Sequence, residues 1–140
     1  MGNVQSWGQL WAASDDKALV DGLRKGADIS ERLLELGAQI LRLVRTVPDD
    51  VAGRHVMAQL VRSSTSGGAN YEEARAAESR ADFIHKLGIA SKELRETIYW
   101  LRLMRNASMT SATLDELIQE TAELTAILVT SRRTARLNSK

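Results

Sequence analysis

The spacing of apolar residues constrains this chain more than any other feature. Three stretches place apolar side chains in alternating steps of three and four residues, which lines up one face of an α-helix. The 140 residues contain a single proline, Pro48, and no cysteine. Most of the remaining sequence is made of residues that favour helix, above all Ala, Leu, Arg and Glu. The pattern therefore predicts an all-α protein with one domain.

Capping residues and the proline predict where the first two helices begin and end. Asp28 and Glu31 have the spacing of a capping box, and Pro48 is expected to stop the helix that follows. A second helix is predicted from about Asp50. The apolar stripe of the first helix consists of Ile29, Leu33, Leu36, Ile40, Leu43 and Val47.

The run of small residues from Ser63 to Asn70 resembles a loop when it is considered alone. The spacing of Arg62, Ser66, Asn70 and Glu73 nevertheless continues one helical face across it, so we predict helix. Its two glycines cost on the order of 1 kcal/mol each inside a helix, and something must compensate. Two interpretations remain open: a tight helix crossing with Ser66 and Asn70 buried and hydrogen-bonded, or a polar site lined by the four face residues.

Two further helices follow the same logic. Ser79 with Asp82 predicts a helix that runs to about Arg105, and Thr113 with Glu116 predicts another. Their stripes are Phe83, Leu87, Ala90, Leu94, Ile98 and Leu101, and then Leu114, Leu117, Thr121, Leu124 and Leu128. Short connections between such helices predict an antiparallel up-and-down four-helix bundle over residues 28–137.

The first 27 residues lie outside this pattern, as does the end of the basic tail at 138–140. Residues 1–27 contain Trp7 and Trp11 and a short amphipathic piece from Ala18 to Leu23, which Gly26 is expected to end. One interpretation is an extra helix packed on the bundle. The other is a partner-docking peptide, since exposed tryptophan is costly unless something covers it.

Two helices carry more apolar surface than a monomeric bundle needs. In the third helix Ile89, Trp100 and Leu103 fall roughly 150° from the main stripe. The additional apolar positions of the first helix are Leu34, Leu41 and Val44. Because both faces of such a helix must be covered, we predict a homo-oligomer, with the amino-terminal extension as the alternative cover.

The sequence shows no pattern typical of catalysis. His55 and His85 stand far apart and outside any metal-binding spacing, and no glycine-rich loop follows a strand. The acid pairs at 72–73 and 115–116 consist of neighbours that point in different directions on a helix. We therefore predict a protein that is not an enzyme, with no cofactor, no metal and no small-molecule substrate.

Bulk charge does not indicate a nucleic-acid partner, because 19 basic residues stand against 18 acidic ones. Local arginines are the candidate phosphate contacts. They are Arg80, Arg95, Arg102 and Arg105 in the third helix, and Arg132, Arg133, Arg136 and Lys140 in the tail. The alternative is that these cations complement the helix dipole or cover apolar surface. With few aromatic side chains to stack on bases, we expect any such binding to be electrostatic.

The predicted location is the cytoplasm. No stretch approaches the roughly 18 apolar residues of a membrane span, the amino terminus lacks an apolar signal core, and no cysteine suggests an oxidising compartment. We expect a soluble protein with no membrane partner.

Several strings resemble a known family. The most specific are Gln59-Leu60-Val61-Arg62-Ser63, Gly68-Ala69-Asn70-Tyr71, the segment from Ala77 to Leu87, and Tyr99-Trp100-Leu101-Arg102. From Asp28 to about Thr134 the chain resembles the four-helix-bundle proteins encoded by intervening sequences in bacterial 23S ribosomal RNA genes. This family includes the accessory variability determinant proteins of diversity-generating retroelements. The residues that match its motif include Arg62, Ser66, Asn70, Glu73, Phe83 and Lys86.

The resemblance implies a homopentameric bundle protein without catalytic residues. In the retroelement branch it implies binding to a reverse transcriptase and to RNA or DNA through basic surface, whereas the role of the other branch is poorly defined. We therefore predict a non-enzymatic accessory or scaffold protein, with a protein-interaction module that binds no nucleic acid as the alternative. Gly67 departs from the family, which usually has a bulky aliphatic residue there, so the nearby helix crossing is expected to be looser or closer.

Overall fold

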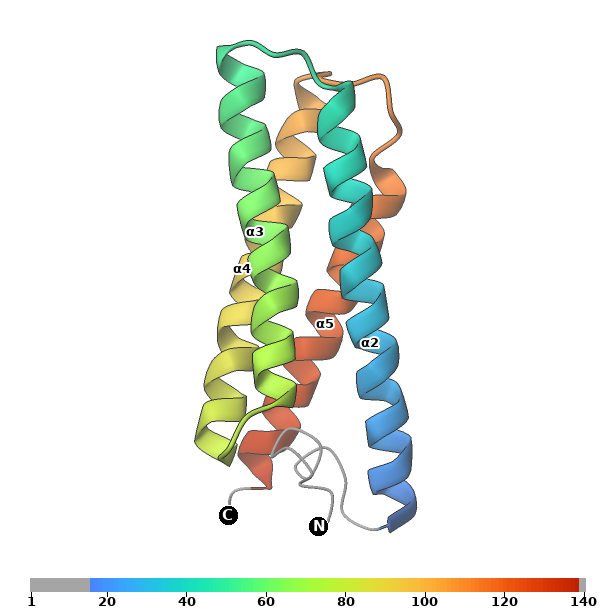
Figure 1. The fold of residues 1–140 in the computed structure, drawn as a ribbon, viewed down its shortest axis with the longest axis vertical. Helices are drawn as coiled ribbons and strands as arrows, with labels where there is room; N and C mark the ends of the chain where they lie inside the picture. Colours follow the sequence, from blue (N-terminus) through green and yellow to red (C-terminus); the bar gives the residue numbers. More distant parts are fainter. Residues whose placement is uncertain (1–15, 139–140) are drawn as a thin grey trace.

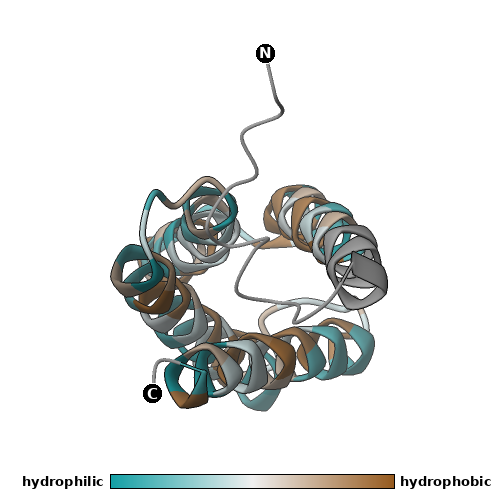
Figure 2. Ribbon diagram, turned by 90° about the horizontal axis from the view of Figure 1, so that it is seen from below, coloured by the Kyte–Doolittle hydropathy of each residue, from teal (hydrophilic) through white to brown (hydrophobic). Residues whose placement is uncertain are grey.

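Four long helices make up the part of the chain that the structure describes. The computed structural model describes residues 16–138, with side chains from residue 26 onward. The helices are α2 (Asp16–Leu43), α3 (Val51–Arg75), α4 (Arg80–Asn106) and α5 (Asp115–Leu137), and a 3₁₀ turn, η1 (Val44–Thr46), extends α2. Consecutive helices run in opposite directions (Figure 1) and lie around a common axis (Figure 2). The predicted all-α fold with four successive helices is confirmed.

Side-chain caps start α3 and α4 where the sequence predicts them. Asp50 accepts a hydrogen bond from the backbone N–H of Gly53 at 2.7 Å, and Ser79 accepts one from the N–H of Asp82 at 3.0 Å. Each bond satisfies one of the amide groups that the first turn of a helix leaves without a partner. Both caps are therefore confirmed.

The predicted capping box at the start of α5 is wrong. Leu114 occupies the cap position, and no side chain makes a capping hydrogen bond there. Instead, Asp115 and Glu116 place negative charge in the first turn, which the positive end of the helix dipole favours. Leu114 is buried, so its packing against the core holds this end of the helix.

The predicted start of the first helix at Asp28 is also wrong. α2 is continuous from Asp16 to Leu43, so Gly26 does not end a separate amphipathic piece. A glycine inside a helix costs about 1 kcal/mol, which neighbouring contacts can offset. One such contact is the hydrogen bond that Tyr71 of α3 donates to the carbonyl of Gly26 at 3.1 Å. Burial raises the pKa of Tyr71 to about 12, so its hydroxyl remains a donor at neutral pH.

The predicted apolar stripes form the core. Every stripe position of the three stretches is buried except Val47 and Ile98, which are partly buried. Some buried side chains are polar: the hydroxyl of Thr97 of α4 donates a hydrogen bond to that of Ser63 of α3 at 3.0 Å, and neither is exposed. The residues that are fully buried and largest are Leu36, Ile40, Leu60, Leu87, Leu94, Leu101, Met104, Leu124 and Leu128.

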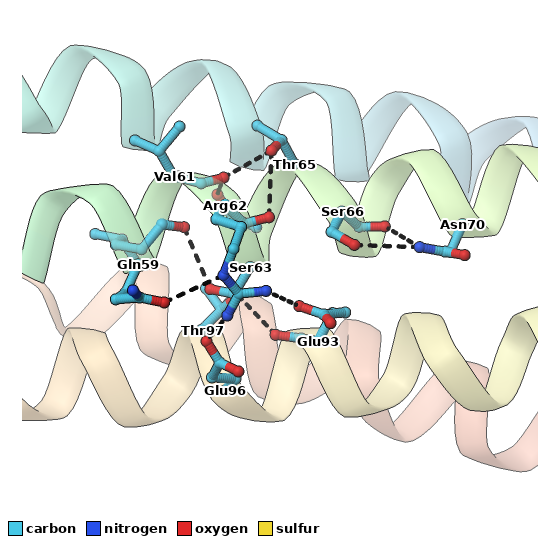
Figure 3. A network of polar contacts seen from close by, with 12 residues as sticks. Gln59, Val61, Arg62, Ser63, Thr65, Ser66, Asn70, Glu93, Glu96 and Thr97 are labelled. Atoms are coloured by element: carbon cyan, nitrogen blue, oxygen red, sulfur yellow. Dashed lines mark hydrogen bonds and ion pairs between the residues drawn. The ribbon is translucent and has the colours of Figure 1, made fainter.

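The run of small residues is an uninterrupted part of α3, as predicted. Gly67 faces α4 closely: a Cβ atom at this position would lie 2.7 Å from Cδ2 of Leu94. The missing side chain therefore lets α3 and α4 approach, and the crossing is close rather than loose. Asn70 is hydrogen-bonded as predicted, since its amide donates to Ser66 one turn earlier on the same helix (Figure 3). The prediction that Ser66 and Asn70 are buried is wrong, because both are only half-buried.

α2 is less tightly integrated than the other helices. The α3–α4 and α4–α5 contacts are the most extensive, and α2 touches α5 only sparsely. Between α2 and α3 an open groove of about 570 Å³ remains. Leu34 and Leu41 line it and are 69% and 45% exposed. None of the helices between residues 16 and 138 has the length and apolar character needed to cross a membrane.

Candidate nucleic-acid interface

The two flanks of α4 carry different charges: paired glutamates face α3, and basic residues face α5. On the α3 side, Arg62 donates hydrogen bonds to Glu93 at 3.0 Å and to Glu96 (Figure 3). Trp100 donates a second hydrogen bond to Glu96 at 3.0 Å. The bond from Trp100, followed by that from Arg62, holds the pKa of Glu96 below its usual value. Arg62 thus compensates part of the charge of these two carboxylates on the α3 flank, away from the basic residues of the α5 flank.

A similar pairing partly compensates the acidic charge of α5. Arg32 of α2 lies 2.5 Å from a carboxylate oxygen of Glu120 and 3.0 Å from one of Glu123. The hydrogen bonds that Arg32 donates to Glu120 are the main reason that the pKa of Arg32 is raised further above its usual value. Both glutamates belong to the first half of α5, so the second half of the helix faces solvent with basic residues and no acid.

The second half of α5 and the facing part of α4 enclose a basic pocket of about 330 Å³. No acidic residue lines it. Among the described residues, no carboxylate pairs with Lys92, Arg95, Arg132 or Arg133, whereas Arg136 makes further contacts. The complete lining is Gly88, Ser91, Lys92, Arg95, Val129, Arg132, Arg133 and Arg136. Cations from two helices therefore converge on one concave surface.

Gly88 determines how Arg132 lies in this basic pocket. The guanidinium of Arg132 passes directly over Gly88, where a Cβ atom would lie 3.1 Å from Nε and 3.2 Å from Nη2. Its Nε donates a hydrogen bond to the carbonyl of Ile84 at 3.2 Å. One N–H is thus fixed to α4, and the guanidinium retains four further N–H donors. The arginine is positioned before any ligand binds.

The other predicted phosphate contacts are dispersed. Arg105 pairs with Asp115 at 2.8 Å, so its charge is compensated. Arg80 donates a hydrogen bond to the carbonyl of Asn138 at 2.7 Å near the end of α5. Arg102 is exposed and lies beyond Arg95 on the same flank of α4. Lys140 lies outside the described residues.

Comparison with known proteins places the chain in a family. The family model described as 23S rRNA-intervening sequence protein matches residues 25–130. The chain belongs to this family. A crystal structure of a protein with unknown function from the S23 ribosomal protein family of Bacteroides thetaiotaomicron is 34% identical and superposes with a TM-score of 0.70. That match covers 78% of this chain and 98% of the other, whereas no curated protein matches significantly.

In this member of the family, the motif residues of α3 do not converge on one polar site. Arg62 pairs with the glutamates of α4, Ser66 and Asn70 bond each other, and Glu73 lies 3.5 Å from Lys86. Phe83 is buried in the core. The motif therefore holds α3 against α4, and the interpretation as a tight crossing fits better than that of a polar site.

The residues predicted at a subunit contact are partly covered within the chain. Ile89 is half-buried, and Trp100 packs against the core with its ring 5.8 Å from that of His55 in an edge-to-face arrangement. Leu103 is 36% exposed. Trp7 and Trp11, predicted to dock a partner, lie outside the described residues.

Sequence reasoning missed Lys92 and Gly88, which line the basic pocket, and Tyr99, which lines a second hollow beside it together with Arg95. The steps from Lys92 to Arg95, Tyr99 and Arg102 are three, four and three residues, so the shared flank was visible in the sequence. The approach of Gly88 to Arg132 was not visible, since it joins two helices. Between residues 26 and 138, no cluster of three His, Asp or Glu side chains has an arrangement that could hold a metal ion.

Proposed function

We propose that this family member is a non-enzymatic accessory or scaffold protein that binds the phosphate backbone of RNA or DNA through the basic pocket between α4 and α5. The observation that supports the proposal is the concave cluster of Lys92, Arg95, Arg132, Arg133 and Arg136 without an acidic neighbour in its lining. Arginine suits this role because its planar guanidinium donates several hydrogen bonds to phosphate oxygens. The family resemblance adds a nucleic-acid enzyme such as a reverse transcriptase as a proposed protein partner.

The salt dependence of binding tests this proposal. We expect the full-length protein to bind fluorescently labelled RNA in an anisotropy titration, with an affinity that falls steeply between 50 and 200 mM salt. Each phosphate contact contributes a slope of about 0.7 to 0.9 in a plot of log affinity against log salt, so four contacts give a slope near −3. Absence of binding at low salt, or binding that salt does not change, would contradict the proposal.

A specific observation favours a second function, self-association through the α2–α3 groove. Leu34 and Leu41 expose apolar surface along this groove. The lining also contains the small residues Gly37, Ala38 and Ala69, which leave room for another helix to approach. Exposed apolar patches rimmed by polar groups are typical of protein–protein contacts. We propose that copies of the chain pack there, with the pentamer as the assembly that the family resemblance implies.

Light scattering at micromolar concentration tests self-association. We expect a mass of about five times the 15.5 kDa of one chain. The double substitution Leu34→Gln and Leu41→Gln should shift the protein toward monomer, because it places polar groups in an apolar contact. A matched control replaces Val51 and Leu137, which are 78% and 63% exposed elsewhere, by Gln and should leave the mass unchanged. A wild-type monomer would rule out the assembly, and an intact oligomer in the Leu34/Leu41 variant would rule out the groove.

A further inference from the structure

A second hollow, of about 320 Å³, lies beside the basic pocket on α4. Its lining includes Tyr99 and Leu103 together with Arg95, Arg102 and Asn106. Arg95 lines both concavities. The two features therefore form one continuous surface on the same flank of α4. From Gly88 to Tyr99 the helix rises about 16 Å, a length that accommodates several nucleotides of an extended strand.

Tyr99 is the most exposed of the Phe, Tyr and Trp side chains in the part of the chain whose side chains are described. It is 56% exposed, whereas Phe83 and Tyr71 are buried and Trp100 is partly buried. The rings of Tyr99 and Trp100 meet edge to face, with centroids 4.9 Å apart and an interplanar angle of 75°. Since Trp100 is itself held by its hydrogen bond to Glu96, the Tyr99 ring packs against a fixed neighbour.

An exposed aromatic ring between two arginines has the chemistry of a base-stacking platform. Arg95 precedes Tyr99 by one helical turn and Arg102 follows it by nearly one turn, so all three project from the same flank. Aromatic rings stack on unpaired bases, while arginines hold the phosphates and add cation–π contacts. Bases inside a duplex are already stacked and paired, so they are not available to such a ring.

We propose that this surface takes single-stranded nucleic acid, with phosphates held over Gly88 and Arg132 in the basic pocket and an unpaired base stacked on Tyr99. The proposal rests on the proposed function of the basic pocket and specifies in addition that the ligand is single-stranded. It replaces the expectation from the sequence that binding is electrostatic alone. Tyr99 contributes affinity for bases of any identity, because every base presents a stacking face.

The test compares three labelled ligands by fluorescence anisotropy at one salt concentration, using the full chain. The ligands are a short uridine oligonucleotide, an abasic strand with the same number of phosphates, and a duplex of equal length. We expect the oligonucleotide to bind more tightly than the abasic strand. Tyr99→Leu should weaken binding of the oligonucleotide by roughly tenfold and leave the abasic strand unaffected, because only stacking is lost.

Matched variants separate the contribution of stacking to the affinity from that of charge, and a folding control excludes a loss of structure. Tyr99→Phe retains the ring and should bind within about twofold of wild type, since the ring supplies the stacking face. Arg95→Gln should weaken both the oligonucleotide and the abasic strand, because Arg95 lines both concavities. Circular dichroism and thermal unfolding confirm that Tyr99→Leu remains folded.

Equal affinity of Tyr99→Leu and wild type for the oligonucleotide would overturn the proposal, as would equal binding of abasic and base-containing strands. Tighter binding of the duplex than of the oligonucleotide would overturn it as well. In each case salt-dependent binding would persist, and the proposed function of the basic pocket would stand. Failure of all three ligands to bind would instead contradict the proposed function itself.

Discussion

Replacing Arg95, Arg132 and Arg133 together by glutamine is expected to weaken nucleic-acid binding by about a hundredfold at 0.1 M salt. The three side chains line the basic pocket, and none of them pairs with a carboxylate of the described residues. Each lost phosphate contact should also reduce the salt slope by nearly one unit, so the variant should have a slope about two to three units shallower. Anisotropy titrations at several salt concentrations measure both quantities.

A control variant with three arginines replaced outside the basic pocket separates the effect of the pocket from the effect of net charge. Arg42, Arg45 and Arg54 lie near the junction of α2 and α3, and two of them pair with Glu35 and Asp49. Their replacement by glutamine changes the formal charge by the same amount and should alter affinity only slightly. Comparable losses in both triple variants would show that binding follows net charge and not the pocket. Helix propensity is preserved throughout, because Gln and Arg are similar helix formers.

Gly67→Val is expected to destabilise the fold by about 2 kcal/mol, the overpacking cost of a filled core site. Even a single Cβ atom at this position would lie 2.7 Å from Cδ2 and 3.1 Å from Cγ of Leu94. Leu94 is completely buried, so the surrounding core restricts its movement. The higher helix propensity of valine offsets only a few tenths of a kcal/mol. Urea unfolding followed by circular dichroism, at one protein concentration, measures the change.

The neighbouring glycine supplies the control. A Cβ atom at Gly68 would meet only Cβ of Leu33 at 3.8 Å, an ordinary contact, so Gly68→Ala should be neutral or stabilise by up to about 1 kcal/mol. Combining Gly67→Val with Leu94→Ala should cost less than the sum of the single changes, because the valine fills part of the space that leucine vacates. Strict additivity of the two changes, or a Gly67→Val variant as stable as wild type, would contradict the close crossing.

The helices and their buried faces could be predicted because both depend on local periodicity. A stripe such as Leu33, Leu36 and Ile40 repeats every three to four residues, and hydrophobic burial then determines which side of the helix faces inward. Caps were less predictable. Asp50 and Ser79 form the expected hydrogen bonds, whereas Asp28 and Thr113 have the same local pattern and do not cap a helix. A capping side chain competes with continuation of the helix, and packing outside the local sequence decides the outcome.

The sequence predicted most of the residues of the candidate site but not how they are arranged in space. Arg95, Arg132, Arg133 and Arg136 were expected as phosphate contacts, and the structure brings them into one pocket. Arg105 was expected beside them but is compensated by Asp115. Which cation remains without an acidic partner depends on distances between helices, and those distances cannot be obtained from spacing along one helix.

The sequence alone therefore determined four helices, their core faces and a surplus of arginine in α4 and α5, since each of these follows from the order of residues within a single helix. Tertiary structure decided how the charges are distributed, because Arg62 and Arg32 form ion pairs with glutamates of other helices. It also decided that the guanidinium of Arg132 lies over Gly88 and that the side chain of Leu94 packs closely against Gly67. Such contacts require two helices to meet at a defined depth and register, and only the packing of the whole core sets both.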